Sequence, residues 1–221
     1  MTIRALVYDA YGTIFDVSSV IGRCETHFPG KGAQISDLWR TKQLEYTWLL
    51  SLMGRYKDFW HLTEAGLRFS CRALSLELTD DIRHDLMDNY LSLTPYTEVA
   101  ATLESLSQKI PQAILSNGSK KMLNTVVENA GLNKFLGNVL SVDDVGIFKP
   151  APKVYQLATD RLGIPTEEIG FVSSNSWDAA GAKAFGFQVF WINRFQRPVE
   201  ELELDPDFVI DTLDKILPMI G

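Results

Sequence analysis

The stretch Asp9-Ala10-Tyr11-Gly12-Thr13 directly follows the apolar run Ala5-Leu6-Val7-Tyr8. A carboxylate therefore appears where a buried strand is expected to surface, and Gly12 allows the backbone to turn tightly after it. In open α/β sheets, ligands bind beyond the carboxyl ends of the strands. Asp9 is thus a candidate nucleophile, and the Thr13 hydroxyl is a candidate group to orient it. The alternative from this stretch alone is an Asp that caps the next turn.

Apolar runs alternate with helical patterns in the second half of the chain. Because strands separated by helices pair in parallel, this alternation predicts an α/β fold with a doubly wound, mostly parallel, Rossmann-like sheet. The predicted strands after 5–8 are 112–115, 139–142, 169–172, 189–192 and 208–210, and the predicted helices are 97–108, a segment around 122–127, 152–162 and 179–185.

One long interruption separates the first strand from this alternation. Residues 17–95 contain no convincing strand and follow helical periodicity, with helices predicted at about 35–53, 59–74 and 79–90. We therefore expect a catalytic core formed by residues 1–16 and 97–221, and a helical domain inserted at 17–96. An apolar stripe in the first of these helices is wider than one helix face needs, and it predicts either insert core or a subunit contact. Its members are Trp48, Leu49, Leu50, Leu52 and Met53.

Composition places limits on the class of protein. A chain of 221 residues with 46% hydrophobic and 11% aromatic content can bury a full core. The net charge of -7 argues against a nucleic-acid surface, which needs clustered Lys and Arg. Neither a signal-peptide core nor a membrane-spanning apolar stretch is found, so we expect a cytoplasmic enzyme without a membrane partner. Cys24 and Cys71 are far apart in sequence and are expected to be free thiols that are at least half buried.

Polar side chains follow three of the predicted strands. Asp9 follows the first, Ser116 and Asn117 end the second, and the segment Ser173-Ser174-Asn175-Ser176-Trp177-Asp178 ends a third. Lys149 comes from a fourth loop. Because the carboxyl ends of parallel strands lie side by side, these groups predict one active site.

Other enzyme classes lack the residues that they need. The sequence contains no G-x-S-x-G nucleophile elbow, no G-x-x-x-x-G-K phosphate loop and no G-x-G-x-x-G fingerprint. The three histidines, His27, His61 and His84, show no metal-ligand spacing and all lie in the insert.

In this order, Asp9-x-Tyr11-Gly12-Thr13, Leu115-Ser116-Asn117-Gly118, Lys149-Pro150 and Ser173-Ser174-Asn175-x-x-Asp178 resemble the haloacid-dehalogenase superfamily. The resemblance covers nearly the whole chain, and further segments resemble the L-2-haloacid dehalogenases of this superfamily specifically. These are Trp39-Arg40-x-Lys42-Gln43-Leu44-Glu45-Tyr46, Tyr56-Lys57-Asp58-Phe59-Trp60 and Leu93-Thr94-Pro95-Tyr96. The resemblance implies that the insert is a helical cap over the core. It also implies a preference for L-2-haloalkanoates and a homodimer.

Two departures from the superfamily's phosphatases are chemically informative. Phosphatases of this type carry a second Asp two residues after the nucleophile, which protonates the leaving alkoxide, and here that position is Tyr11. A departing halide is a very weak base and needs no proton. The Gly-Asp pair that helps to hold Mg²⁺ is Ser173-Ser174 here, and the loss of a carboxylate weakens a site for a hard cation. We therefore expect metal-free chemistry at carbon, with no cofactor.

The resemblance and the residues together imply a set of roles. Asp9 would attack the halogen-bearing carbon, and Thr13 would orient Asp9. Arg40 and Asn117 would stabilise the leaving halide, and Ser116 would hold the substrate carboxylate. The predicted walls of the pocket, each of which could otherwise be core, are Tyr11, Gln43, Leu44, Phe59, Tyr155 and Trp177.

Lys149 and Asp178 would complete the chemistry. Lys149 would neutralise Asp9, Asp178 and the anionic substrate, although a Lys beside a Pro can also face solvent. Asp178 would activate water, with Ser173 and Asn175 orienting it, although an Asp here can also cap the next helix. Two alternatives stay open. The protein could be a Mg²⁺-dependent phosphatase or phosphonatase of the same superfamily, or a catalytically silent binding protein on this fold.

Overall fold

A computed structural model describes residues 2–220. Six strands form one sheet in the order β3-β2-β1-β4-β5-β6, and every neighbouring pair is parallel. Consecutive parallel strands need a crossover connection, and the helices predicted between them supply it. The prediction of a doubly wound α/β sheet is confirmed.

The strands lie close to the predicted ranges. They are β1 (Ala5–Tyr8), β2 (Gln112–Ser116), β3 (Asn138–Ser141), β4 (Ile169–Ser173), β5 (Gln188–Ile192) and β6 (Phe208–Ile210). Every residue of β1, β2, β4 and β5 is buried, as continuous apolar runs in a sheet that is covered on both faces require. In the register of the sheet, Tyr8 lies beside Ile114 on one side and Val172 on the other, so Asp9 leaves the sheet between β2 and β4.

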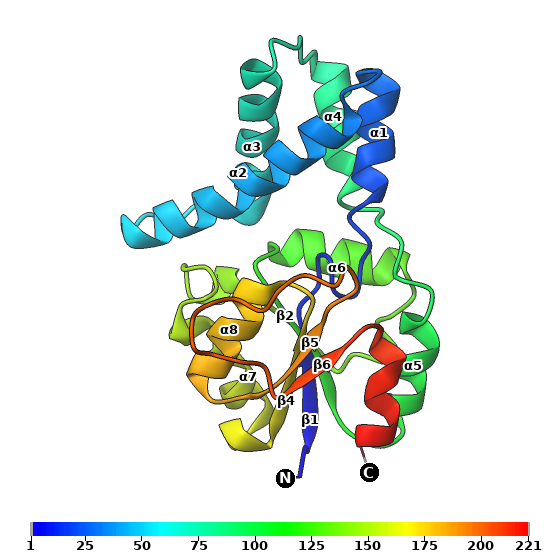
Figure 1. The fold of residues 1–221 in the computed structure, drawn as a ribbon, viewed down its shortest axis with the longest axis vertical. Helices are drawn as coiled ribbons and strands as arrows, with labels where there is room; N and C mark the ends of the chain where they lie inside the picture. Colours follow the sequence, from blue (N-terminus) through cyan, green and yellow to red (C-terminus); the bar gives the residue numbers. More distant parts are fainter. Residues whose placement is uncertain (1, 221) are drawn as a thin grey trace.

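Helices cover both faces of the sheet. Figure 1 shows α7 and α8 on one side, and α5 with a C-terminal 3-10 segment on the other. Two of the helices begin at residues that favour a helix start. The Ser119 hydroxyl accepts a hydrogen bond from Met122 N at the start of α6, and Pro152 occupies the first turn of α7. The elements are α5 (Val99–Ser107), α6 (Lys120–Asn129), α7 (Pro152–Leu162), α8 (Ser176–Phe185) and the 3-10 segment η3 (Leu213–Met219).

The insert forms a helical lobe above the carboxyl edge of the sheet (Figure 1). It contains α1 (Ser19–His27), α2 (Gly32–Leu52), α3 (Phe59–Ala73) and α4 (Asp80–Asn89). The predicted helices are confirmed, with α4 capped by Thr79, but the sequence analysis did not identify α1. Helices α2 and α3 pack closely at Gly66, where an added Cβ would lie 3.1 Å from the Trp39 side chain and 3.2 Å from Gln43 N.

Two connections join the lobe to the sheet and pair with each other. Asp16 N donates a hydrogen bond to Thr94 O at 2.9 Å, and Tyr96 N donates to Ile14 O at 3.1 Å. We call residues 13–16 and 94–98 the hinge segments. The predicted return hinge around Pro95 thus runs beside the loop that carries Thr13.

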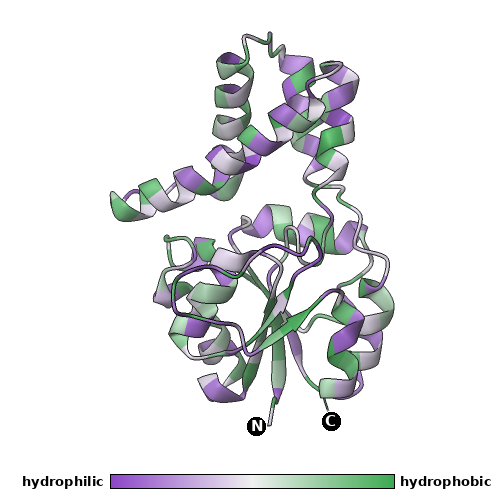
Figure 2. Cartoon of the chain, in the orientation of Figure 1, coloured by the Kyte–Doolittle hydropathy of each residue, from purple (hydrophilic) through white to green (hydrophobic). Residues whose placement is uncertain are grey.

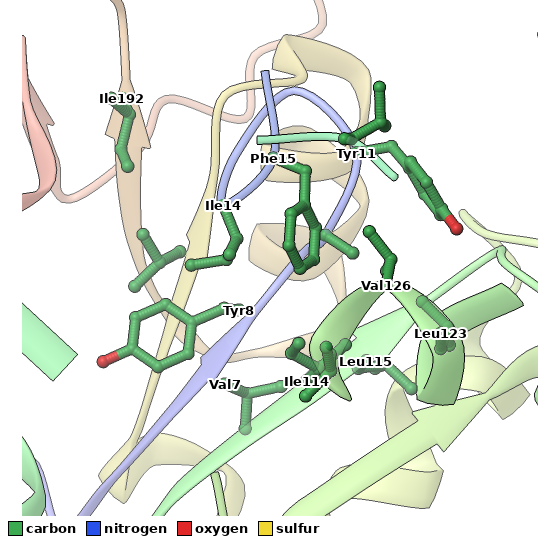
Figure 3. Packing of buried hydrophobic residues seen from close by; sticks show 14 of the residues in the cluster. Val7, Tyr8, Tyr11, Ile14, Phe15, Ile114, Leu115, Leu123, Val126 and Ile192 are labelled. Carbon is green, nitrogen blue, oxygen red and sulfur yellow. The ribbon is translucent and has the colours of Figure 1, made fainter. Parts of the chain in front are cut away.

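The apolar core lies around the sheet and continues to the hinges. Figure 3 shows Tyr8 on β1, Ile14 on the loop that follows it, and Phe15 near Val126 of α6. The Tyr8 hydroxyl is satisfied by the Gln112 side chain at 2.7 Å. Figure 2 shows hydrophobic residues concentrated in the strands and alternating with hydrophilic ones on the helices. The predicted thiols, Cys24 and Cys71, are free and buried.

The apolar stripe on α2 is not core along its whole length. Leu52 is 86% exposed and Met53 is 59% exposed at the free end of the helix, which projects from the lobe in Figure 1. Leu49 is also exposed, whereas Leu50 packs partly against the core. Of the two interpretations of the stripe, insert core therefore holds only for its inner residues. Among residues 2–220, no helix is long and apolar enough to cross a bilayer.

Candidate active site

Asp9 occupies the first position beyond β1 and is 6% exposed. The loop that follows closes on itself, because Ile14 N and Phe15 N both donate to Ala10 O. Gly12 has a φ of +92°, which a residue with a side chain adopts only under strain. The loop therefore returns Thr13 to the Asp9 side chain.

Three side chains donate to the Asp9 carboxylate. Thr13 Oγ1 lies 3.1 Å and Asn175 Nδ2 lies 2.8 Å from Asp9 Oδ2. Lys149 Nζ lies 3.2 Å from the other oxygen, Oδ1. No backbone N–H among residues 2–220 binds this carboxylate, so Asp9 does not cap the turn as the alternative interpretation required.

Thr13 is held in its donor role by a second bond. Its hydroxyl oxygen accepts from Ser174 N at 2.8 Å. Since a hydroxyl has one proton, this acceptance leaves the Thr13 proton free to point at Asp9. The place of the phosphatases' metal-binding Asp is thus taken by Ser174, which contributes a backbone N–H to the nucleophile loop.

Lys149 is fully buried, so the solvent-facing alternative is wrong. Its Nζ lies 2.8 Å from Asp178 Oδ2 and 3.2 Å from Asp9 Oδ1. Its backbone N donates to Asn117 Oδ1 at 2.9 Å, which fixes the loop against the end of β2. One ammonium therefore lies between two carboxylates.

Asp178 is also fully buried and is bound by three side chains. Beside Lys149, Tyr155 OH donates to Oδ1 at 2.7 Å and Ser173 Oγ donates to Oδ2 at 3.1 Å. Asp178 lies in the first turn of α8, whose N-cap is Asn175, so the interpretation of Asp178 as the cap is wrong. Burial raises the pKa of Asp178, the charge of Lys149 opposes the rise, and the charge of Asp9 adds to it.

Tyr155 lies elsewhere than predicted. Its ring packs in the core against Phe171, Phe185 and Phe187, and its hydroxyl binds Asp178. A ring enclosed in this way is no wall for a substrate. Its sequence pattern, an aromatic on the inner face of α7, does not distinguish the two roles.

Arg40 reaches the core from the insert. Its guanidinium donates to Asn175 Oδ1 at 3.3 Å and to Gln43 Oε1 at 2.7 Å. Gln43 is buried and donates to Thr63 Oγ1 at 2.7 Å. Gln43, predicted as a wall, therefore holds Arg40 in place, and Thr63, which sequence reasoning missed, holds Gln43.

Several buried donors at the site lack a partner. Asn117 Nδ2 and Tyr11 OH are both buried without a hydrogen bond to any residue in 2–220. Burial is also the main cause that raises the pKa of Tyr11. Ser116 Oγ accepts from Gly118 N at 3.1 Å, so its own proton is not committed by that bond. Buried donors without partners mark a place where a polar ligand can satisfy them.

The remaining predicted walls divide between two places. The rings of Tyr11 and Phe59 lie 6.1 Å apart and join the core to the insert. Leu44 and Trp177 line a cleft of about 330 Å³ between the insert and the sheet, together with Arg40 and Asn175. This cleft gives a small molecule access to the edge of the Asp9 site.

Among residues 2–220, no group of three or more His, Cys, Asp or Glu side chains is arranged to hold an ion. The space between the Asp9 and Asp178 carboxylates holds the Lys149 ammonium instead. A cation that is part of the chain therefore balances the charge that Mg²⁺ would otherwise balance.

Sequence reasoning missed one contact between the insert and the core. The Tyr56 hydroxyl, in the loop between α2 and α3, donates to Asp143 Oδ1 at 2.5 Å, and Asp143 follows β3. In the sequence, Tyr56 is distinctive only as part of the segment Tyr56-Lys57-Asp58-Phe59-Trp60. No local pattern reveals a partner that is 87 residues away.

Comparisons with known proteins agree with this geometry. The family model for haloacid dehalogenase-like hydrolases matches residues 3–186. The chain is 49% identical over 215 residues, 97% of its length and 94% of the relative's, to (S)-2-haloacid dehalogenase 2 of Pseudomonas sp. strain CBS-3.

Solved structures give the same result. The L-2-haloacid dehalogenase RSc1362 has a TM-score of 0.98 at 43% identity, covering 100% of this chain and 99% of that one. The Xanthobacter autotrophicus L-2-haloacid dehalogenase with chloropropionic acid covalently bound has a TM-score of 0.93 at 38% identity, with both chains fully covered. With a buried Asp beyond β1, a buried Lys between two carboxylates and this match over most of its length, the chain belongs to the family of haloacid dehalogenase-like hydrolases.

Proposed function

We propose that this enzyme converts L-2-haloalkanoic acids to D-2-hydroxyalkanoic acids with inversion, through an ester on Asp9 and without a metal. One observation carries the proposal. The Asp9 carboxylate is buried and held on both oxygens, and the lysine that binds it also binds a second carboxylate, Asp178. A two-step hydrolysis through a covalent intermediate uses a nucleophile and a base, and these two carboxylates lie in one buried site on either side of Lys149. The names of the relatives and the covalent chloropropionate adduct of one of them support it.

The first half-reaction is a displacement at carbon. An Asp9 oxygen attacks C2 from the face opposite the halogen, the new C–O bond forms, and the halogen leaves with the electron pair of the C–halogen bond. Attack from the back inverts C2. The Arg40 guanidinium, next to Asn175 and hence to Asp9, stabilises the charge that develops on the halide. No proton is needed, in keeping with a tyrosine at position 11.

The second half-reaction is hydrolysis of the ester. Asp178 accepts a proton from water, and the resulting hydroxide attacks the carbonyl carbon of the Asp9 side chain. The bond from that carbon to the oxygen that joins it to C2 breaks, and the departing oxygen takes up the proton held by Asp178, which restores Asp178. Asp9 is restored, and C2 is not touched again, so the product keeps the inverted configuration. Ser173 and Tyr155 hold Asp178 for this step.

The substrate carboxylate needs donors of its own. We assign it to the Ser116 hydroxyl and the end of β2, and we assign the halide side to Arg40 and Asn117. The unpartnered Asn117 Nδ2 supports the second assignment, because a buried amide without an acceptor is costly until a ligand supplies one. Leu44, Phe59 and Trp177 enclose the alkyl group and exclude water.

We also propose that residues 17–96 act as a cap over the core formed by residues 1–16 and 97–221. The bond from Arg40 of α2 to Asn175 supports this division, because the site is complete only with the insert in place. The exposed apolar end of α2, at Leu52 and Met53, supports a homodimer contact. The free thiols of Cys24 and Cys71 fit a cytoplasmic location.

Halide release tests the proposal. Purified enzyme in EDTA is given L- or D-2-chloropropionate, beside an Asp9→Asn variant and its folding check by circular dichroism. We expect chloride from the L form only, insensitive to chelator and absent in the variant. No chloride from either form, with hydrolysis of p-nitrophenyl phosphate on adding Mg²⁺, would overturn the proposal in favour of a phosphatase.

A further inference from the structure

Arg194 follows β5 and contacts both hinge segments. Its Nη2 lies 2.6 Å from Glu98 Oε1, in the segment that returns from the insert. Its guanidinium carbon lies 3.8 Å from the centre of the Tyr96 ring. The same Nη2 donates to Thr13 O at 3.4 Å, in the segment that leaves the sheet. One side chain thus bridges the start and the end of the insert.

The position of Arg194 is costly for stability. Its side chain is 10% exposed, and its Nε is buried with no partner in residues 2–220. Desolvation of a charge offsets much of what an ion pair contributes, and an orphaned donor adds to the cost. Stability alone is therefore a weak reason for an arginine at this position.

The contact to Thr13 connects Arg194 to the chemistry. Thr13 is held at two of its atoms by different parts of the core. Ser174 N donates to its hydroxyl, and Arg194 donates to its carbonyl oxygen. The Thr13 hydroxyl in turn donates to Asp9 Oδ2. A shift of the Thr13 main chain would rotate or withdraw this donor and change the direction of the attacking carboxylate.

We infer that Arg194 is a positioning residue for the first half-reaction, and this inference rests on the proposed function. Arg194 acts through Thr13 on the orientation of the Asp9 carboxylate. Arg194 contacts Thr13 in the loop after Asp9, and it contacts Tyr96 and Glu98 in the hinge segment 94–98. The planar guanidinium is suited to this, because one face stacks on the Tyr96 ring while an edge binds Glu98 and Thr13 O. A small misplacement of a reacting group costs much rate.

A second explanation for Arg194 is attraction of the anionic substrate. Arg194 lines the same cleft as Arg40, and its positive charge alone would favour entry of a carboxylate. The two explanations predict different results for Arg194→Lys, because lysine would preserve charge attraction but not the positioning of Thr13. Lysine keeps the charge but has neither the flat face nor the fork of donors.

The experiment measures the two half-reactions separately in Arg194→Lys, Arg194→Ala and wild type. Excess enzyme is mixed with L-2-chloropropionate, quenched at intervals, and the Asp9 ester is followed by mass spectrometry. The matched control is Arg197→Ala, because Arg197 is exposed on the same loop and lines the same cleft, while its guanidinium lies 5.9 Å from the Phe195 ring and forms no ion pair with a hinge residue in 2–220. Glu98→Gln removes the ion pair but keeps the bond from Arg194 to Thr13. Thermal midpoints are recorded for all variants.

We expect ester formation to slow by about tenfold to a hundredfold in both Arg194 variants, with ester hydrolysis and KM little changed. Guanidinium ion, well below denaturing concentrations, should restore part of the rate in Arg194→Ala only. Glu98→Gln should lower the thermal midpoint while keeping ester formation closer to wild type than Arg194→Lys does.

Three results would overturn the inference. A wild-type rate in Arg194→Lys with a raised KM in Arg194→Ala would assign the residue to charge attraction. A lower midpoint with unchanged ester formation would make it merely structural. If Arg194→Ala does not fold, a normal rate in Arg194→Lys still refutes the positioning role. Absence of ester in the wild type is a different outcome, since it refutes the proposed function itself.

Discussion

The Lys149 ammonium lies 2.8 Å from the Asp178 carboxylate, and both side chains are fully buried. The same ammonium lies 3.2 Å from Asp9, so the nucleophile and the base of the proposed mechanism share a single counter-ion. An anionic substrate adds another negative charge to this group. The account therefore predicts that removal of this one cation affects binding, both steps and the fold.

Replacing the cation tests its importance. Lys149→Met leaves two buried carboxylates unpaired, and breaking a buried pair costs about 3–5 kcal/mol of unfolding free energy. We expect this loss at neutral pH, together with loss of ester formation, measured by denaturant unfolding and by mass spectrometry. The matched control is Lys153→Met, since Lys153 is exposed on α7. Equal stability of the two variants would contradict the ion-pair description.

The raised pKa of Asp178 predicts a pH dependence. Its carboxyl must be ionised to accept a proton, so ester hydrolysis should fall, as pH decreases, at a pH above the ordinary value of 3.8. The hydrogen bond from Tyr155 lowers this pKa, so Tyr155→Phe should move the fall to higher pH. Single-turnover rates across pH measure both. A fall at lower pH in Tyr155→Phe would show that this bond does not stabilise the ionised form.

The same shift has a defined sign for stability. The folded chain holds the Asp178 proton more tightly than the unfolded chain does. The contribution of this group to the free energy of unfolding therefore decreases as pH rises from 3.8 through the raised pKa. Comparing wild type with Asp178→Asn by denaturant unfolding across this range isolates the contribution, because the variant cannot titrate here.

Arg40 should matter more for poorer leaving groups. Chloride leaves less readily than bromide and relies more on stabilisation of its developing charge. Arg40→Lys loses the fork that binds Asn175 and Gln43, so we expect kcat to fall more for 2-chloropropionate than for 2-bromopropionate. Steady-state rates with both substrates measure the ratio. An equal loss for both halogens would place Arg40 away from the leaving group.

The bond from Tyr56 to Asp143 should hold the insert against the core. Tyr56→Phe removes it, and a hydrogen bond to a carboxylate contributes about 1.5–3 kcal/mol. We expect a higher KM and faster amide hydrogen exchange in the insert, with a smaller effect on kcat. Tyr46→Phe is the control, because the Tyr46 ring packs against Phe69 within the insert. An unchanged KM and exchange rate would show that other contacts hold the insert.

The sheet and most helices were predictable because their signals are local. Continuous apolar runs that end in polar residues located β1, β2 and β4, together with the side chains at their ends. Helix α1 was missed because it is only nine residues long and Ser18 makes no capping bond with its side chain. Short elements of this kind depend on packing that sequence periodicity does not record.

The sequence was sufficient to predict which residues lie together in the site, but not which of their atoms form hydrogen bonds and ion pairs. Asp9, Lys149 and Asp178 were placed together by strand order, whereas the position of Tyr155 behind Asp178 needed coordinates. Tyr56 and Arg194 were not identified because their partners are distant in sequence and their own neighbourhoods are ordinary. Contacts of this kind depend on tertiary geometry, and no periodicity or motif spacing in a single sequence indicates them.

The central claim is that water attacks Asp9 and not the substrate. Excess enzyme is allowed one turnover of L-2-chloropropionate in water enriched in oxygen-18, and both the product and the peptide that contains Asp9 are weighed. The account predicts the heavy oxygen in the Asp9 carboxylate and an unlabelled D-2-hydroxypropionate. Label in the product with none in Asp9 would mean direct attack of water on carbon, and would contradict the ester mechanism.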